Sequence, residues 1–157
     1  MKLADFVCFE AIVPQLKAND RDGVIIELIT ALDKAGKLGR GHAQKIAKAI
    51  IKREKEASTG MGKGVALPHV KYPVLKDVIA VIGQTESGID FSSLDKEPVY
   101  SVILLISPVD DPEKHLQAME AIFTHLQRDN FRKFLRQSKT IEQIEDLIRE
   151  ADIDPSL

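Results

Sequence analysis

Three polar side chains stand where the surrounding sequence pattern calls for apolar residues: Arg53, His69 and His115. A neutral imidazole can act as a nucleophile or a hydrogen-bond donor near neutral pH, and a guanidinium offers forked donors to a phosphate or carboxylate. One arginine and two histidines are therefore suited to hold and react with a single small anion, such as a phosphoryl group. Each also has a purely structural interpretation, which depends on the element that carries it.

Arg53 comes near the end of a helix predicted over about residues 42–57. Ile46 precedes it by seven residues, which is close to two full helical turns. Arg53 therefore continues the apolar stripe at the C-terminal end of this helix. An arginine in this position can extend its head group to solvent, cap the last carbonyl groups, or contact an anion.

His115 has the same arrangement on a later predicted helix, which Asp111 caps and Pro112 begins. Met119 and Ile122 follow it by four and seven residues, so the imidazole shares their buried face. It also lies in the first turn of the helix, where unpaired backbone N–H groups favour an anion. The structural alternative is a partly buried histidine whose hydrogen bonds are satisfied.

His69 ends a short extended segment that follows a glycine-rich loop. The loop, Ser58-Thr59-Gly60-Met61-Gly62-Lys63-Gly64, has three glycines in five residues, which indicates unusual backbone dihedrals or close approach to another group. Its spacing is not that of a P-loop and no helix follows it. Strand ends facing such a loop are where α/β domains place their chemistry, although a lone histidine is more often structural.

The remaining pattern predicts the elements that would position these residues. Residues 6–16 predict an edge strand or an irregular segment around Pro14. Continuous β-branched runs at 78–82 and 99–106 are typical of strands covered on both faces. Apolar spacing predicts helices over about residues 24–32, 42–57, 112–126, 130–137 and 140–151. We expect one α/β domain over residues 1–157, a layered mixed β-sheet with helices on both faces.

Composition excludes several classes of protein. Twenty-two basic and 24 acidic residues give a net charge of −2, so the electrostatic footprint of a nucleic-acid binder is absent. The longest uninterrupted apolar runs have five residues, far short of the ~20 that span a bilayer. Cys8 is the single cysteine, and with four dispersed histidines it gives no zinc spacing. We expect a cytoplasmic protein without metal, cofactor or direct membrane insertion.

The segment from Arg53 to His69 resembles that of phosphotransferase-system EIIA type-2 domains, the family of mannitol and fructose IIA and nitrogen-regulatory IIA proteins. The family pattern has an arginine-led helix end, a small-residue and glycine loop, an Ala–apolar–Pro–His segment, and a second histidine beginning a later helix. Ala66-Leu67-Pro68-His69 and His115 match it, and the resemblance covers about residues 5–150. The chain departs from the pattern at Val70, where members often have glycine or alanine. We expect this valine to narrow the docking surface for partners.

The resemblance implies a phosphotransferase component, a phosphohistidine carrier that needs no cofactor. It implies that His69 accepts the phosphate and that Arg53 and His115 support it. The donor would be an HPr-like phosphocarrier protein, and the acceptor or partner a permease subunit or a regulatory target protein. Close backbone approach to the phosphate would come from the loop residues Ser58, Thr59, Gly60, Gly62 and Gly64.

Two outputs and a non-catalytic alternative stay open. The preferred prediction is a nitrogen-regulatory IIA, because the loop from Ser58 to Gly62 is similar to that of this branch and no permease domain follows before Leu157. The second is a fructose- or mannitol-type IIA that passes its phosphate to a separate permease subunit. The third is a partner-binding module of the same fold without phosphate turnover, although such a module would not need His69.

Overall fold

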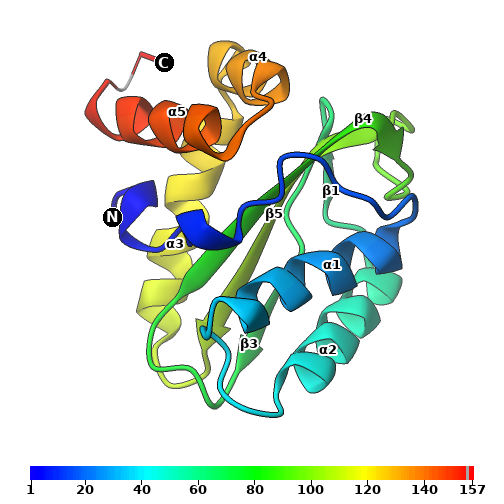
Figure 1. Cartoon of the computed structure of the whole chain (residues 1–157), viewed down its shortest axis with the longest axis vertical. Helices are drawn as coiled ribbons and strands as arrows, with labels where there is room; N and C mark the ends of the chain where they lie inside the picture. Colours follow the sequence, from blue (N-terminus) through cyan, green and yellow to red (C-terminus); the bar gives the residue numbers. More distant parts are fainter. Residues whose placement is uncertain (155) are drawn as a thin grey trace.

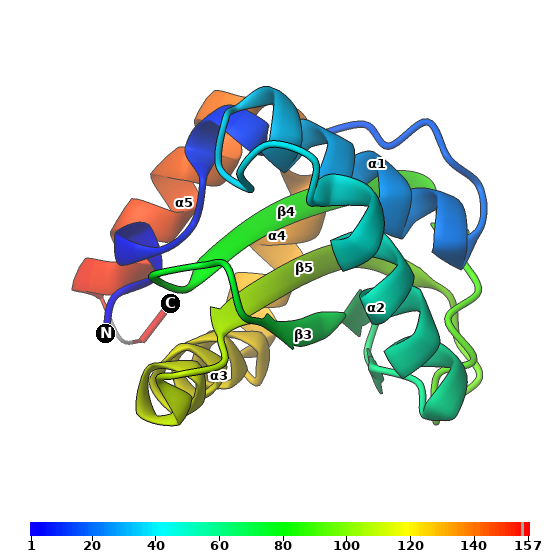
Figure 2. The same ribbon diagram turned by 90° about the horizontal axis from the view of Figure 1, so that it is seen from below.

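The computed structural model describes residues 1–154 and 156–157 and has the expected α/β architecture. The strands are β1 (Gly60–Gly62), β2 (Val65–Ala66), β3 (His69–Tyr72), β4 (Ile79–Ile89) and β5 (Val99–Pro108). They form one five-stranded mixed sheet, in which β2 and β3 run parallel to β5 and follow one another along the same edge of it. β4 pairs antiparallel with the other edge of β5, and β1 pairs antiparallel with β2. Figure 2 shows β5 between β4 and β3.

Five α-helices cover the two faces of this sheet. They are α1 (Arg21–Lys34), α2 (Ala43–Glu56), α3 (Pro112–Leu126), α4 (Asp129–Gln137) and α5 (Ile141–Ile153). One face carries α1 and α2, and the other carries α3, α4 and α5 (Figure 1). Within the described part of the chain, no helix is long and apolar enough to cross a bilayer.

Successive residues of the central strands enter two different cores. Ile103 and Leu105 of β5 pack among the side chains of α3, α4 and α5, whereas Val102, Leu104 and Ile106 pack among those of α1 and α2. A strand buried on both faces needs apolar residues at every position, not at alternate ones. The continuous run at 99–106 therefore predicted helices on both faces correctly.

For residues 6–16 the sequence predicted either an edge strand or an irregular segment. The structure has the irregular segment, so the edge strand is wrong. Two short 3₁₀ helices, η1 (Leu3–Asp5) and η2 (Phe9–Ala11), occupy it. Only isolated bridges join it to β4, from Val7 to Ala80 and from Val13 to Gly83. Pro14 follows the second bridge, and beyond it the Leu16 amide still donates a 2.8 Å hydrogen bond to the carbonyl of Gln84.

Three other local predictions need correction. The segment 58–64 is not a plain loop, because Gly60 and Gly62 pair with β2 to form a β-hairpin. His69 begins strand β3, whereas the sequence pattern placed it at the end of a strand. β4 continues from the predicted 78–82 to Ile89. The second and third differences depend on pairing with the distant strand β5, which local patterns do not encode.

Candidate functional site

His69 is the first residue of β3 and aligns with Leu105 of β5. Leu105 belongs to the core beneath α3, so His69 lies on the α3 side of the sheet. Its ring is partly buried, and Nδ1 lies 2.7 Å from the carbonyl oxygen of Leu67. A carbonyl only accepts hydrogen bonds, so Nδ1 carries the proton and Nε2 keeps its lone pair. In the neutral tautomer that donates this bond, one ring nitrogen is thus fixed and the other is free.

His115 lies in the first turn of α3 and faces His69 across the edge of the sheet. The two ring centroids are 5.9 Å apart, with an interplanar angle of 41°. Nδ1 of His115 lies 2.7 Å from the hydroxyl of Ser107, a fully buried residue near the end of β5. Asp111 caps α3, as predicted, by accepting a 3.1 Å hydrogen bond from the Lys114 amide. β5 and the helix that follows it thereby fix the His115 ring.

Burial and nearby positive charge both favour the neutral form of His115. Burial lowers the pKa of His115, and the nearby charges of Lys71 and His69 lower it further. Lys71 pairs with Ser107 and follows His69 by two residues on β3, which places both on one face of the strand. Sequence reasoning missed Lys71 and Ser107. The signal for Lys71 was its spacing of two residues from His69, which places both side chains on one face of a strand. The signal for Ser107 was its position directly after an apolar run.

Arg53 adopts the capping role that was one of its three alternatives. Its Nη1 donates a 2.8 Å hydrogen bond to the carbonyl of Ala57, the residue that ends α2. The helix packs against β3, but among the described residues Arg53 makes no hydrogen bond to His69. One of five guanidinium donors is used in this way, so the structure leaves the others available.

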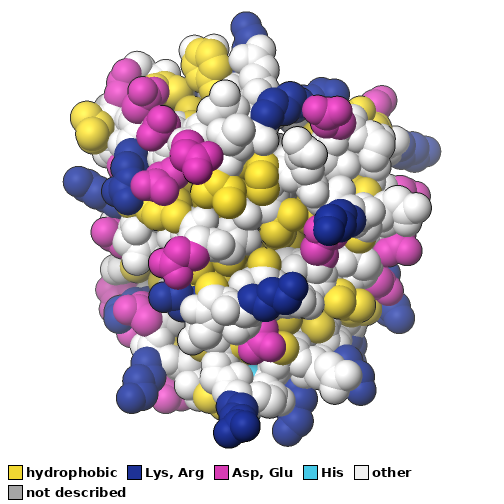
Figure 3. Space-filling view, viewed as in Figure 1, with side chains coloured by type: hydrophobic (Ala, Val, Ile, Leu, Met, Phe, Trp, Pro, Cys, Tyr) yellow, Lys and Arg dark blue, Asp and Glu magenta, His cyan; other side chains and the backbone are white. Residues whose placement is uncertain are grey.

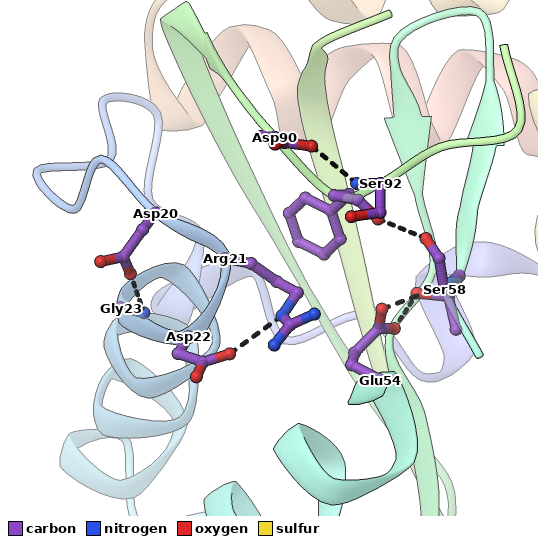
Figure 4. A network of polar contacts seen from close by, with 10 residues as sticks. Asp20, Arg21, Asp22, Gly23, Glu54, Ser58, Asp90 and Ser92 are labelled. Carbon is purple, nitrogen blue, oxygen red and sulfur yellow. Dashed lines mark hydrogen bonds and ion pairs between the residues drawn. The ribbon is translucent and has the colours of Figure 1, made fainter. Parts of the chain in front are cut away.

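The first part of the glycine-rich segment uses its hydrogen-bond donors inside the fold. The Thr59 amide donates to the carboxylate of the buried Glu54 at 3.1 Å, and the Thr59 hydroxyl donates to the same carboxylate. The Ser58 hydroxyl donates to the carbonyl of Phe91 and accepts from the amide of Gly60 at 3.0 Å. Figure 4 shows Glu54 and Ser58 within this network. These groups hold the hairpin on the end of α2 and do not face an anion.

The last part of the segment lies far from His69. The Tyr100 amide donates a 2.8 Å hydrogen bond to the carbonyl of Gly64, so Gly62 and Gly64 lie near the start of β5. His69 aligns instead with Leu105. Five residues of extended chain correspond to roughly 16 Å. The structure therefore brings His69 and His115 together but does not bring the glycines of the hairpin to them.

Val70 lies on the other side of β3. It aligns with Ile106 and packs against the core beneath α1 and α2. Because neighbouring residues of a strand face opposite ways, Val70 does not line the surface around the imidazole. Val70 therefore does not contact the imidazole, and its effect on docking stays a prediction.

Solved structures contain this fold. The chain superposes on the nitrogen regulatory protein IIA-Ntr from Neisseria meningitidis with a TM-score of 0.83, covering 93% of this chain and 98% of that one at 20% sequence identity. The common architecture is an α/β protein with a mixed sheet between helices.

Sequence comparison then defines the family. The model described as "Phosphoenolpyruvate-dependent sugar phosphotransferase system, EIIA 2" matches residues 6–151. The chain belongs to this EIIA type-2 family and is a phosphoryl carrier of the phosphotransferase system.

Curated relatives divide between two named roles. A "Nitrogen regulatory protein" of Bradyrhizobium diazoefficiens is 34% identical over 144 residues, 92% of either chain. The "PTS system fructose-specific EIIABC component" of Bacillus subtilis is 33% identical over 152 residues, 97% of this chain. This chain spans only 24% of the length of that Bacillus protein.

Proposed function

We propose that His69 is the residue that carries the phosphoryl group, with Nε2 as the attacking atom. The hydrogen bond between Nδ1 and the Leu67 carbonyl supports this most directly, because it leaves the Nε2 lone pair free on a partly exposed ring. Nε2 attacks the phosphorus of a phosphohistidine on the donor protein. The Nε2–P bond forms while the donor's N–P bond breaks, and the donor imidazole regains its lone pair. The Nδ1 proton stays on His69, where the carbonyl stabilises the positive charge that the ring gains.

His115 supplies the next contribution, a donor for the transferred oxygens. When the Ser107 hydroxyl donates to Nδ1 of His115, the proton of this neutral ring resides on Nε2. That N–H can then bond to an oxygen of the phosphoryl group on His69. Lys71 adds a positive charge on the same face of β3. Phosphoryl transfer depends mainly on such positioning and charge neutralisation.

The experiment is phosphorylation by phosphoenolpyruvate, the general phosphotransferase enzyme and an HPr-like phosphocarrier, followed by intact-mass measurement. We expect a gain of one acid-labile phosphate, absent in His69→Ala and unchanged in His125→Gln, a matched control elsewhere on α3. A gain that survives in His69→Ala would overturn the assignment. No gain in the native chain with any phosphocarrier would favour the binding module.

Arg53 needs a separate test because its observed bond is structural. If it also contacts the phosphoryl group, Arg53→Ala slows transfer about tenfold or more, while loss of the cap at Ala57 costs about 1 kcal/mol of unfolding free energy. Arg53→Lys serves as the control, since it retains the charge without the forked donors. A transfer rate unchanged in both variants would make Arg53 a cap alone.

For the output of the carrier we propose regulation through binding to a target protein. The 34% identity to a nitrogen regulatory protein along 92% of both chains supports it. The 33% identity to a fructose-specific component favours a second candidate, transfer to a permease subunit. Pull-down with the phosphorylated protein and with His69→Ala separates them. A target retained by only one form supports regulation, and rapid loss of phosphate to a sugar-permease subunit supports transport.

A further inference from the structure

A cationic cleft lies at the opposite end of the sheet from His69. Its volume is about 800 Å³, and five of its nine lining residues are basic: Lys63, Arg132, Lys133, Arg136 and Lys139. Only two carboxylates line it, Glu86 and Asp129. Figure 3 shows Lys and Arg side chains gathered at the upper end of this face, over α4 and the neighbouring end of the sheet. The whole chain has a net charge of −2, so this concentration of positive charge is local.

The ion pairs within the cleft leave three cations uncompensated. Arg132 pairs with Asp129, and Lys139 pairs with Glu86 at 3.0 Å. Among the described residues, Lys63, Lys133 and Arg136 form no ion pair. Five positive and two negative side chains therefore leave a charge of +3 in one cleft.

The helix that carries most of these cations is fixed on the sheet. Gln84 is a buried residue of β4 whose side-chain amide donates to the carbonyl of Leu135 in α4 and accepts from the Ser101 hydroxyl. The Arg136 guanidinium lies 3.6 Å from the centroid of the Tyr100 ring, a cation–π contact. Arg132 donates a 2.6 Å hydrogen bond to the carbonyl of Leu126. Arg132 and Arg136 of α4 are thus held in place before any ligand arrives.

Lys63 reaches the cleft from the hairpin through a strained turn. Gly62, Lys63 and Gly64 all have positive φ, of 85°, 58° and 80°. Lysine rarely adopts this left-handed conformation, and such strain concentrates where a side chain has a functional position. The Lys63 amide donates a 2.9 Å hydrogen bond to Asp95, which holds the turn. The glycine-rich motif, which does not reach His69, therefore places a cation opposite those of α4.

We propose that this cleft binds a small molecule carrying two or more linked phosphates. Three uncompensated cations match the charge of a di- or triphosphate group, and about 800 Å³ is large enough for a ligand of nucleotide size. Thr85 lines the cleft and is only 8% exposed. Its hydroxyl lies 3.2 Å from the hydroxyl of Ser87. The carboxylates of Glu86 and Asp129 interrupt the positive surface of the cleft. They would repel the continuous phosphate backbone of a nucleic acid, so the cleft suits a small ligand better.

Calorimetric titration of the full chain with inorganic triphosphate at 150 mM salt tests the site. We expect binding that Lys63→Gln/Lys133→Gln weakens at least tenfold. The control Lys34→Gln/Lys45→Gln removes the same charge from exposed positions on α1 and α2 and is expected to change affinity less than twofold. His69→Ala should bind as the native chain does, so this result does not depend on the phosphoacceptor assignment.

Three other results decide the ligand class. Orthophosphate is expected to bind at least tenfold more weakly than triphosphate, because one phosphate cannot reach both sides of the cleft. If adenosine triphosphate binds more tightly than inorganic triphosphate, the ligand is a nucleotide. If the two bind with equal affinity, the phosphate chain is the recognised group. The proposal is overturned if triphosphate does not bind at millimolar concentration, if both double variants lose affinity equally, or if a single-stranded oligonucleotide binds more tightly.

Discussion

We propose one anion site at each end of β5, and the two sites use different groups. At the Leu105 end, the His69 imidazole donates a hydrogen bond to the Leu67 carbonyl, and the His115 imidazole is hydrogen-bonded to the Ser107 hydroxyl. At the Tyr100 end, the groups are permanently charged lysines and arginines. A phosphoryl carrier must release its cargo, which neutral and titratable groups permit. Fixed charges instead suit a ligand that binds without reacting.

Removing His115 should separate the two ends most clearly. We expect His115→Ala to slow phosphorylation of His69 about 100-fold, the loss typical of one donor to a developing charge, while triphosphate affinity stays within twofold. Rapid-quench kinetics with a saturating phosphocarrier measures the rate. Gln117→Ala, an exposed position two residues further along α3, is the control. An unchanged rate in His115→Ala would remove this histidine from the site.

A pair of buried serines at the two ends of β5 sharpens the comparison. Ser107→Ala releases His115 Nδ1, and Ser101→Ala releases the Gln84 side chain near the cleft. Each should cost about 1 kcal/mol of unfolding free energy in chemical denaturation. Only Ser107→Ala should also slow phosphotransfer, about tenfold, because His115 then loses its fixed proton position. Equal rates in the two variants would make Ser107 purely structural.

The pH dependence of stability should come from two histidines of α3, His115 and His125. Burial lowers the pKa of both His115 and His125, so the folded chain binds fewer protons than the unfolded chain just below about pH 6.5. The free energy of unfolding is therefore expected to fall as the pH drops from 7.5 to 5.5. Denaturation of His125→Gln should show a shallower fall, whereas Lys63→Gln/Lys133→Gln should follow the native slope. A native stability that rises toward pH 5.5 contradicts this.

The smallest effect concerns the strained turn. Lys63→Gly should be more stable than Lys63→Ala by about 1 kcal/mol, since glycine adopts positive φ without steric cost. Both variants should weaken triphosphate binding alike, because both remove the ammonium group. Thermal denaturation combined with calorimetric titration measures the two quantities. Equal stability of the variants would show that the turn relaxes around any side chain.

Local sequence patterns were sufficient for the helices and for the two-sided burial of β5. The apolar spacing around Ile46 and the run at 99–106 each report directly on burial. His69 and His115 lie 46 positions apart in the sequence, and no local pattern indicates that they are close in space. Their proximity was predicted from the family resemblance.

The glycine-rich segment shows where such reasoning fails. Its composition signals a backbone with positive φ, which is present at Gly62 and Gly64. The direction in which the turn points depends on the pairing of β2 with residues 101 and 102 of β5. Similarly, nothing near Thr59 indicates that Glu54 will take up its amide and hydroxyl. Register and buried polar pairing are properties of the assembled sheet.

Nδ1 of His69 donates the hydrogen bond that orients the ring to the main-chain carbonyl of Leu67. Any amino acid at position 67 carries the same carbonyl, so no side-chain replacement there deletes the acceptor. Pro68 is held in turn by its own carbonyl, which accepts a 2.9 Å bond from the Leu105 amide. The orientation of the imidazole is thus set by the backbone. Surrounding side chains can therefore change to suit new partners without changing the direction in which Nε2 points.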